Sequence, residues 1–184
     1  MLGHAIMHKQ AGFSLVEMMI VVVLLAIIAA IAVPSFTQMI QNSRIRTAAE
    51  SIQNGLQIAR AEAVKRNARV KFQLNNGDSG WVICEVANAA DSCPGEEQIQ
   101  TRAVSEGSTA DVTTSVVPTG RLTAVFTGMG LLDPAANSFT QVDVDMSAAV
   151  MSPADSRELR IIVGAGGSIR MCDPNLAETD PRAC

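Results

Sequence analysis

GFSLVEMMIVVVLLAIIAAIAVP, residues 12–34, is the stretch that decides how this chain folds. Residues 13–33 cover 21 positions and carry a single charged side chain, Glu17. At about 1.5 Å of rise per residue, a helix of this length measures roughly 32 Å, which is enough to cross the hydrocarbon core of a bilayer. We therefore expect one membrane-spanning helix in this part of the chain.

Three interpretations of this segment compete. A secretory signal peptide would be cut after its apolar core, where residues 29–32 offer small side chains, but such a core normally covers about 7–15 residues and this run is longer. A plain single-span anchor accounts for the length. Neither of them explains Glu17, because an ionisable group at membrane depth is costly and usually functional.

The third interpretation explains the leader and the glutamate together. Residues 1–12, MLGHAIMHKQAG, form a short polar leader that ends in glycine; Phe13 follows, and Glu17 stands four residues beyond it. This arrangement resembles the class III signal of type IV pilins and type II secretion pseudopilins. The resemblance implies that a prepilin peptidase cuts between Gly12 and Phe13 on the cytoplasmic side, and that the new amino terminus of Phe13 is N-methylated.

The same resemblance gives Glu17 and Pro34 roles in assembly. An amine and a carboxylate at low dielectric are each costly alone, and they offset one another when neighbouring subunits bring them together, which would set the axial register of the helices. Pro34 ends the apolar run, and a proline inside a helix removes one hydrogen bond and produces a kink. Many type IV pilins carry a proline at this offset, which favours a pilus over a secretion system; the simpler interpretation is that Pro34 marks the membrane exit.

Beyond the apolar run, the pattern predicts a helix and then strands. Between residues 35 and 67, apolar side chains recur at spacings of three and four, which predicts an amphipathic helix with one stripe packed on a sheet. The stripe consists of Ile45, Ala48, Ala49, Ile52, Leu56, Ala59 and Ala63. After Asn67 the period changes to two, and we expect strands at residues 70–74, 81–86, 99–105, 112–117, 122–127, 139–145, 158–163 and 167–172.

A helix followed by strands predicts an α+β fold, pilin-like, with a long N-terminal helix packed on a β-sheet-rich head. We divide the chain into a leader peptide (1–12), a transmembrane or filament-core helix (13–34), an amphipathic helix (35–67) and a β-rich head (68–184). The downstream half resembles the GspH/FimT/FimU group of the pilin superfamily. That resemblance depends on the segments Leu56–Val64 (LQIARAEAV), Phe126–Gly130 (FTGMG), Ile161–Gly164 (IIVG) and Gly167–Arg170 (GSIR).

The four cysteines, Cys84, Cys93, Cys172 and Cys184, all lie beyond the apolar segment. An even number of cysteines on one side of a membrane anchor suggests an oxidising compartment. Three pairings exist, and we favour the local pairs Cys84–Cys93 and Cys172–Cys184, each closing a short loop that contributes about 2–3 kcal/mol in the chain-entropy model. The alternative is four buried free thiols.

The composition argues against an enzyme. The only two histidines, His4 and His8, precede the proposed cut, so the mature chain would have no histidine base or histidine metal ligand. Asp143 and Asp145 share one face of an expected strand, but no third oxygen ligand lies at EF-hand spacing, so we expect a solvated sheet edge there and not a calcium site. We expect no catalytic residue, metal or cofactor.

The net charge of −4 gives no general field that attracts nucleic acid. Residues 44–71 are locally basic, with seven Lys and Arg against two Glu, and we interpret this stretch as a solvated helix face. Some FimT-type proteins bind DNA through a Gly-Arg-x-Arg stretch near the carboxyl end. This chain has Gly167-Ser168-Ile169-Arg170, which retains only Arg170, so DNA contact is considered but not favoured.

The resemblance implies a non-catalytic minor pilin that joins other pilins in a tip complex, primes type IV pilus assembly and supports adhesion, twitching motility or DNA uptake. The alternatives are a type II secretion pseudopilin of the GspH kind and a DNA-binding receptor for natural transformation. The expected partners are minor and major pilins or pseudopilins, and the prepilin peptidase. The expected location is the inner membrane, crossed once with a cytoplasmic amino terminus and a periplasmic head, and then an extracytoplasmic filament.

Overall fold

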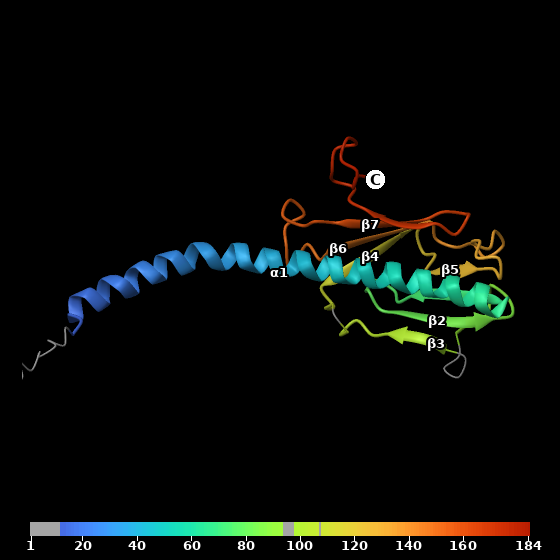
Figure 1. Ribbon diagram of the computed structural model, residues 1–184, viewed down its shortest axis with the longest axis horizontal. Helices are drawn as coiled ribbons and strands as arrows, with labels where there is room; N and C mark the ends of the chain where they lie inside the picture. Colours follow the sequence, from blue (N-terminus) through green and yellow to red (C-terminus); the bar gives the residue numbers. More distant parts are fainter. Residues whose placement is uncertain (1–11, 94–97, 107) are drawn as a thin grey trace, which may run out of the picture. The chain divides into compact units, whose positions relative to one another are not determined.

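The computed structural model describes residues 12–93, 98–106 and 108–184 (Figure 1). Most of the predicted leader, residues 1–11, lies outside this part of the chain. The elements are α1 (Leu15–Arg66), β1 (Arg69–Leu74), β2 (Trp81–Val86), β3 (Gln98–Arg102), β4 (Val112–Val117), β5 (Thr123–Phe126), β6 (Gln141–Met146), β7 (Leu159–Val163) and β8 (Ile169–Cys172).

The chain forms two compact units, one extending to Thr37 and one from Gln38 to Cys184. The described part of the first unit is almost entirely the apolar beginning of α1. The second unit, which we call the head, contains the rest of α1 and all the strands named above. Pro34 lies inside α1, so it does not end the helix.

The carboxyl end of α1 is closed by a left-handed residue. Asn67 has a φ of 50°. The Ala68 N–H donates to the Ala63 carbonyl at 3.2 Å, and the Asn67 N–H donates to the Val64 carbonyl at 3.3 Å. These two bonds form a Schellman motif, which satisfies carbonyls that a helix end otherwise leaves unpaired. The sharp turn starts β1 directly after the helix.

The strands of the head form two antiparallel four-stranded sheets, in the orders β3-β2-β1-β5 and β4-β6-β7-β8. The predicted apolar stripe of α1 is fully buried, and inward-facing residues of both sheets join it in one core. Phe72 and Trp81 lie together there with ring centroids 5.6 Å apart. The Trp81 indole N–H donates to the Ser51 hydroxyl of α1 at 3.0 Å, which ties sheet and helix together. The structure therefore confirms the α+β fold and the stripe.

All the strands expected from the sequence are present; β2 and β4 have the expected bounds, and the ends of the others are shifted. The largest differences are at β3, which ends at Arg102, and at β6, which covers Gln141–Met146. The strand expected from residue 167 starts only at Ile169, because Gly167 has a φ of 76° and its N–H donates to the Gly164 carbonyl in a tight turn. Turn geometry thus set the boundaries that the alternating pattern left undefined.

Candidate assembly site and surface of the head

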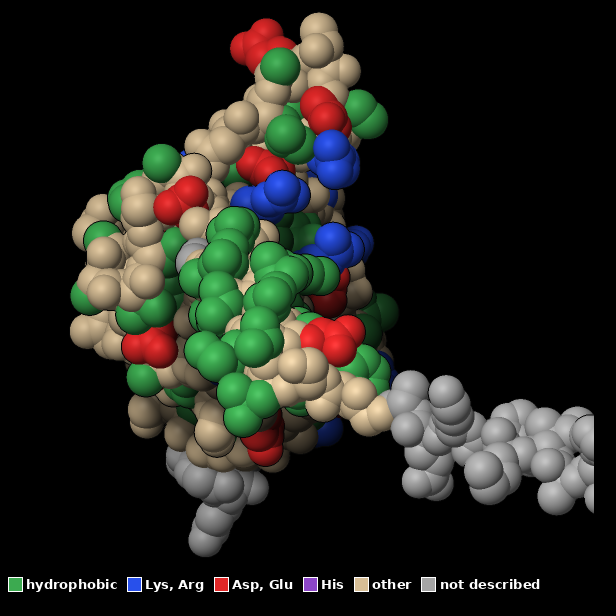
Figure 2. Space-filling view, turned by 90° about the vertical axis from the view of Figure 1, so that its left-hand side faces the viewer, with side chains coloured by type: hydrophobic (Ala, Val, Ile, Leu, Met, Phe, Trp, Pro, Cys, Tyr) green, Lys and Arg blue, Asp and Glu red, His purple; other side chains and the backbone are tan. Residues whose placement is uncertain are grey.

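The apolar half of α1 presents a continuous hydrophobic surface (Figure 2). Its most apolar 18-residue window has a mean hydropathy of 3.0, and no share of that window is buried within the chain. By length and composition this helix is able to cross a membrane. A surface of this extent on an isolated chain has to be covered by lipid or by other protein.

The start of this helix carries the residues of the predicted processing signal. Phe13 is 78% exposed, and Ser14 precedes the first helical residue, Leu15. The Met18 N–H donates to the Ser14 carbonyl at 3.1 Å, and Glu17 lies in the first turn. An acidic residue there is favourable because the helix dipole leaves partial positive charge at this end.

Ser14 and Glu17 also have the spacing of a capping box, Ser-x-x-Glu. The role predicted for Glu17 from the sequence is to pair with an amine. This spacing is a local signal in the sequence for the helix start that the structure places at Leu15.

The head half of α1 differs from the apolar half, since its outer face is charged. Arg46 pairs with Glu50 at 2.8 Å, and Glu62 accepts from Lys65 at 3.0 Å and from Arg66 at 2.8 Å. Hydrogen bonds from Arg66 and then Lys65 lower the pKa of Glu62. Such exposed pairs contribute little to stability, which agrees with a solvated face.

Two glycine loops pack against the end of α1. The Arg60 guanidinium Nε donates to the Gly130 carbonyl at 3.0 Å. A Cβ atom at Gly167 would lie 2.0 Å from that same carbonyl oxygen, and one at Gly128 would lie 2.9 Å from the Asn67 backbone. The FTGMG and GSIR segments noted in the sequence therefore have a structural reason: only glycine allows both loops to approach the helix so closely.

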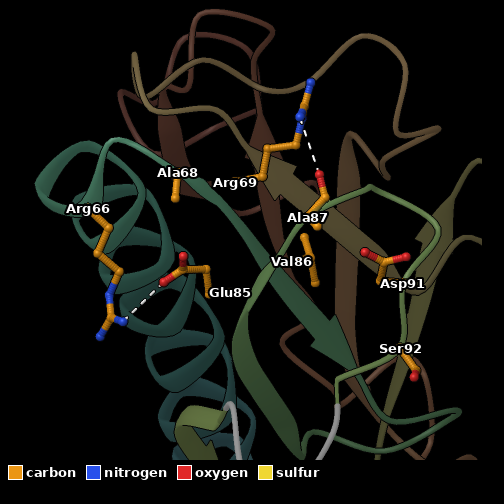
Figure 3. A pocket seen from close by; sticks show the side chains of 8 residues that line it. All are labelled: Arg66, Ala68, Arg69, Glu85, Val86, Ala87, Asp91 and Ser92. Atoms are coloured by element: carbon orange, nitrogen blue, oxygen red, sulfur yellow. Dashed lines mark hydrogen bonds and ion pairs between the residues drawn. The ribbon is translucent and has the colours of Figure 1, made fainter.

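A broad hollow of about 910 Å³ lies where α1, β1 and β2 meet the loop after β2 (Figure 3). The Cys84–Cys93 disulfide ties this loop back to β2. The ion pair between Arg66 and Glu85, at 3.2 Å, crosses one side of the hollow. It is lined by Arg66, Ala68, Arg69, Glu85, Val86, Ala87, Asp91 and Ser92.

Lys71 is buried near this loop, and the interpretation of residues 44–71 as a solvated face is therefore wrong at this residue. It is only 4% exposed, and its ammonium donates to the Asp91 carbonyl. Burial lowers the pKa of Lys71, and the nearby Asp91 carboxylate opposes that change. Arg69 lies on the same strand, and its Nε pairs with the Asp133 carboxylate at 2.9 Å. Strand alternation puts residues 69 and 71 on the sheet face away from α1. The cross-linked loop covers Lys71, whereas the Arg69 side chain stays half exposed.

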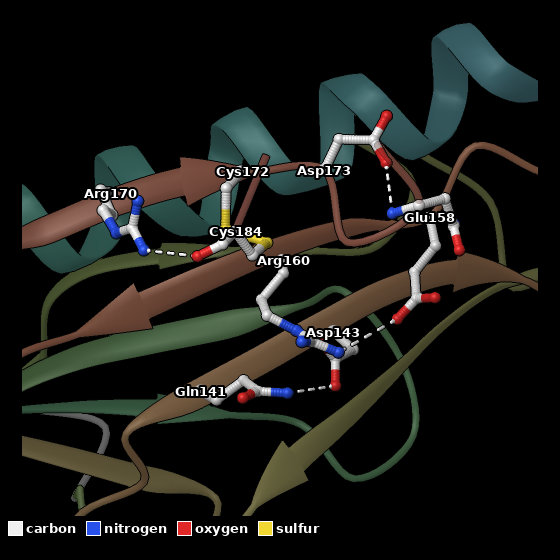
Figure 4. The surroundings of a disulfide bond; sticks show 9 residues. Gln141, Asp143, Glu158, Arg160, Arg170, Cys172, Asp173 and Cys184 are labelled. Carbon is white, nitrogen blue, oxygen red and sulfur yellow. Dashed lines mark hydrogen bonds and ion pairs between the residues drawn. A yellow bond between two sulfur atoms is a disulfide. The ribbon is translucent and has the colours of Figure 1, made fainter. Parts of the chain in front are cut away.

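The second disulfide, Cys172–Cys184, closes a loop after β8 (Figure 4). Arg170 is exposed on β8, and its Nη2 donates to the Cys184 carbonyl at 3.1 Å. The Asp173 N–H donates to the Arg182 carbonyl at 2.8 Å, which pairs the two ends of the loop. The structure thus joins the same two cysteine pairs that the sequence favoured.

The prediction that Asp143 and Asp145 lie at a solvated sheet edge is wrong. Both are on β6, an interior strand between β4 and β7. Asp143 pairs with Arg160 at 2.6 Å and accepts from Gln141 at 2.7 Å, as Figure 4 shows. Burial, followed by the charges of Asp143 and Asp145, raises the pKa of the neighbouring Glu158. Alternation gave the shared face correctly, but strand order depends on long-range pairing that a local pattern does not contain.

Across the described ranges, no group of three or more His, Cys, Asp or Glu side chains is placed to hold a metal ion. Two models of protein families match the sequence. The model described as Type II transport protein GspH matches residues 48–167, about two thirds of the chain. The chain belongs to the GspH family. The model described as Prokaryotic N-terminal methylation motif matches residues 7–33.

Two crystal structures of the type IV minor pilin FimU from Pseudomonas aeruginosa PAO1 are similar to this GspH-family protein. The structure in space group P21 has 21% identity, covers 74% of this chain and 93% of that chain, and gives a TM-score of 0.51. The structure in space group P65 has 20% identity, covers 73% and 98%, and gives a TM-score of 0.49. The first likeness supports the pilin-like fold, and the family places the chain among minor pilins and pseudopilins.

The GspH match begins inside the buried stripe of α1 and ends at the Gly167 turn. The glycine loops that contact α1 therefore lie within the matched region, and the loop closed by Cys172–Cys184 lies beyond it. The methylation motif contains Gly12, Phe13 and Glu17. The cut after Gly12, the methylation of Phe13 and the assembly roles of Glu17 and Pro34 stay predictions.

Proposed function

We propose that this GspH-family protein is a minor pilin that joins other pilin-like subunits at a filament tip and primes type IV pilus assembly. The observation that carries the proposal is the change of surroundings along α1: its first half is apolar and exposed, and its second half is buried along one stripe. The exposed half has lipid as its partner before assembly and other subunits afterwards. Filaments of this kind would support adhesion, twitching motility or DNA uptake.

Processing and location follow from the same proposal. The chain is inserted once in the inner membrane, with a cytoplasmic amino terminus and the head outside the cytoplasm, where the two disulfides persist. A prepilin peptidase cuts between Gly12 and Phe13 and methylates Phe13. The new amine lies at the positive end of the α1 dipole, so a carboxylate such as Glu17 from a neighbouring subunit stabilises it.

The test compares Glu17→Ala with Glu50→Ala in cells that supply the prepilin peptidase and a pilus system. Glu50 is a matched control, because it is an exposed acid on the same helix that pairs with Arg46. Both variants should insert in the membrane and be cut to begin at methylated Phe13, as mass spectrometry would show. Only the Glu17 variant should be depleted from sheared filaments. Normal incorporation of that variant, or a chain that keeps its leader, would overturn the proposal.

A type II secretion pseudopilin is the second candidate, and the description of the matching GspH model favours it. Cross-linking of the mature chain in cells that contain both machines would separate the two. Cross-links to pilus subunits support the minor pilin, whereas cross-links to pseudopilins support the secretion machine.

A DNA receptor is the third interpretation and depends on Arg170. This residue is exposed, although its guanidinium already donates to the Cys184 carbonyl. A gel-shift experiment at low salt with the full chain in detergent tests it. A shift that Arg170→Gln abolishes supports DNA reception, and the absence of any shift removes it.

A further inference from the structure

The dipeptide Asn-Gly occurs twice in this chain, at residues 54–55 and at residues 76–77. This pair has a chemistry of its own, because the backbone nitrogen that follows an asparagine is able to attack the asparagine side chain, and glycine puts no Cβ atom in the way. The two copies have the same sequence and lie in different surroundings. They therefore show what the fold does to one and the same reactive pair.

The first copy, Asn54-Gly55, lies inside α1. The backbone N–H of an interior helical residue donates to the carbonyl four residues before it, so the Gly55 nitrogen is engaged in the helix. Gly55 is also buried against the aromatic pair of the core: a Cβ atom at this position would lie 2.7 Å from Phe72 Cε2 and 2.9 Å from Trp81 Cε2. Attack on the Asn54 side chain therefore requires that the helix opens and that this packing separates.

The second copy, Asn76-Gly77, lies in the turn between β1 and β2, and both of its residues are exposed. The hydrogen bonds of this turn lie on either side of the pair: the Asn75 N–H donates to the Gly80 carbonyl at 2.9 Å, and the Gly80 N–H donates to the Asp78 carboxylate at 2.7 Å. Among the described residues, no hydrogen bond involves the Asn76 side chain or the Gly77 N–H. Gly77 has a φ of 84°, and apart from its two neighbours nothing lies within 4 Å of the place that a Cβ atom would take. The attacking nitrogen is therefore free and its approach is open.

We propose that Asn76 is a site of spontaneous deamidation. The Gly77 nitrogen loses its proton and bonds to the side-chain carbonyl carbon of Asn76; the bond from that carbon to Nδ2 breaks, and ammonia leaves with the proton. One water molecule then opens the cyclic imide. Addition of the water at one carbonyl gives aspartate, and addition at the other gives isoaspartate, in which the backbone passes through the side chain. In both products an amide has become a carboxylate, so the chain gains one negative charge.

The turn is held to the rest of the head outside the reacting pair. The Thr114 hydroxyl of β4 donates to the Asp78 carbonyl at 2.8 Å, and the register of β1 on β2 begins at Leu74 and Trp81. The deamidated chain should therefore keep its fold while its surface becomes more acidic beside Asp78. The reaction needs only this turn and water, so it does not depend on the function proposed above.

The test incubates the folded full chain in detergent micelles and follows both Asn-Gly pairs by peptide mapping with mass spectrometry, with Asn54 as the matched control in the same molecule. An opening step that costs about 1.4 kcal/mol already slows a reaction tenfold, and packed helices open at a higher cost, so Asn76 should react at least about tenfold faster than Asn54. The rate at Asn76 should rise with pH, because the attacking nitrogen has to lose its proton. In denaturant the two sites should react at similar rates. Asn76→Gln should abolish the acidic shift of the incubated chain in isoelectric focusing, and Asn54→Gln should leave it unchanged.

Three outcomes would overturn the proposal. The first is a rate at Asn76 in the folded chain that is no higher than the rate at Asn54. The second is modification of Asn76 in denaturant but not in the folded chain, which would mean that the turn protects it. The third is an acidic shift that persists in the Asn76→Gln variant, which would place the modification elsewhere in the chain.

Discussion

The two halves of α1 have the same secondary structure and opposite surroundings. From Leu15 to Val33 the side chains, apart from Glu17, are overwhelmingly apolar on every face and exposed, whereas from Ile45 to Ala63 one stripe is completely buried and the other face is charged. The first half is stable as a helix where lipid or neighbouring subunits exclude water. The second half is stable because its stripe packs on two sheets. One continuous helix thus joins a part whose apolar surface is not covered within the chain to a part that packs on two sheets.

The largest expected difference between the halves is the cost of shortening a buried side chain. Ile52 is fully buried and Ile28 is 53% exposed. Ile52→Ala should lower the free energy of unfolding of the head by about 2–5 kcal/mol, and Ile28→Ala should leave it nearly unchanged. Trp81, the single tryptophan, reports denaturant unfolding of the full chain in micelles by its fluorescence. An equal loss of unfolding free energy in the two variants would contradict the difference between the two halves of α1.

Removing a disulfide should have the second-largest effect, and it too should affect the head and not the apolar half of α1. Replacing Cys172 and Cys184 together with serine removes a cross-link worth about 3 kcal/mol in the chain-entropy model, and replacing Cys84 and Cys93 should cost a similar amount, because each pair contains one buried cysteine. Both double variants should lower the midpoint of head unfolding. The helical circular dichroism of the apolar half should persist, since that half has no cross-link. Loss of that signal together with the head would mean that the halves are coupled.

A smaller effect is expected at the bond between α1 and the sheet. Ser51→Ala removes the acceptor for the Trp81 indole N–H and should destabilise the head by about 1 kcal/mol. Ser35→Ala, at an exposed position of the same helix, is the control and should have no effect. Denaturant unfolding followed by Trp81 fluorescence measures both. An unchanged midpoint for the Ser51 variant would mean that the hydroxyl is not needed.

The smallest effect is a pH dependence in the loop after β8. Hydrogen bonds from the Arg182 side chain and backbone lower the pKa of Asp180 to about 2, from an ordinary value of 3.8. Because the folded-state pKa is the lower one, the contribution of this carboxylate is complete above pH about 4 and is lost as the pH falls through about 2. An NMR titration of the Asp180 carboxyl carbon should show this midpoint, and Arg182→Gln should return it toward the ordinary value. A wild-type midpoint near 3.8 would contradict the pairing.

Much of the head was predictable because its patterns are local. The spacing of Ile45, Ile52 and Leu56 gave the buried stripe, and alternation around Phe72 gave the strands, since one buried face imposes each period. The even cysteines with short separations indicated the two pairs that the structure joins. The burial of Lys71 was not predicted. The loop that covers it is held in place by a disulfide and by long-range packing, and a local hydrophobic pattern contains no information on either.

The sequence by itself determined that a long apolar helix starts after Gly12, that its continuation is amphipathic, and that strands follow, because each of these depends on neighbours a few residues apart. Only the tertiary structure decided that β6 is an interior strand and that Gly130 and Gly167 meet beside Arg60. These juxtapositions join residues separated by tens to more than a hundred positions. Such contacts are set by how the sheets pack on the helix, and the chain order alone does not contain that information.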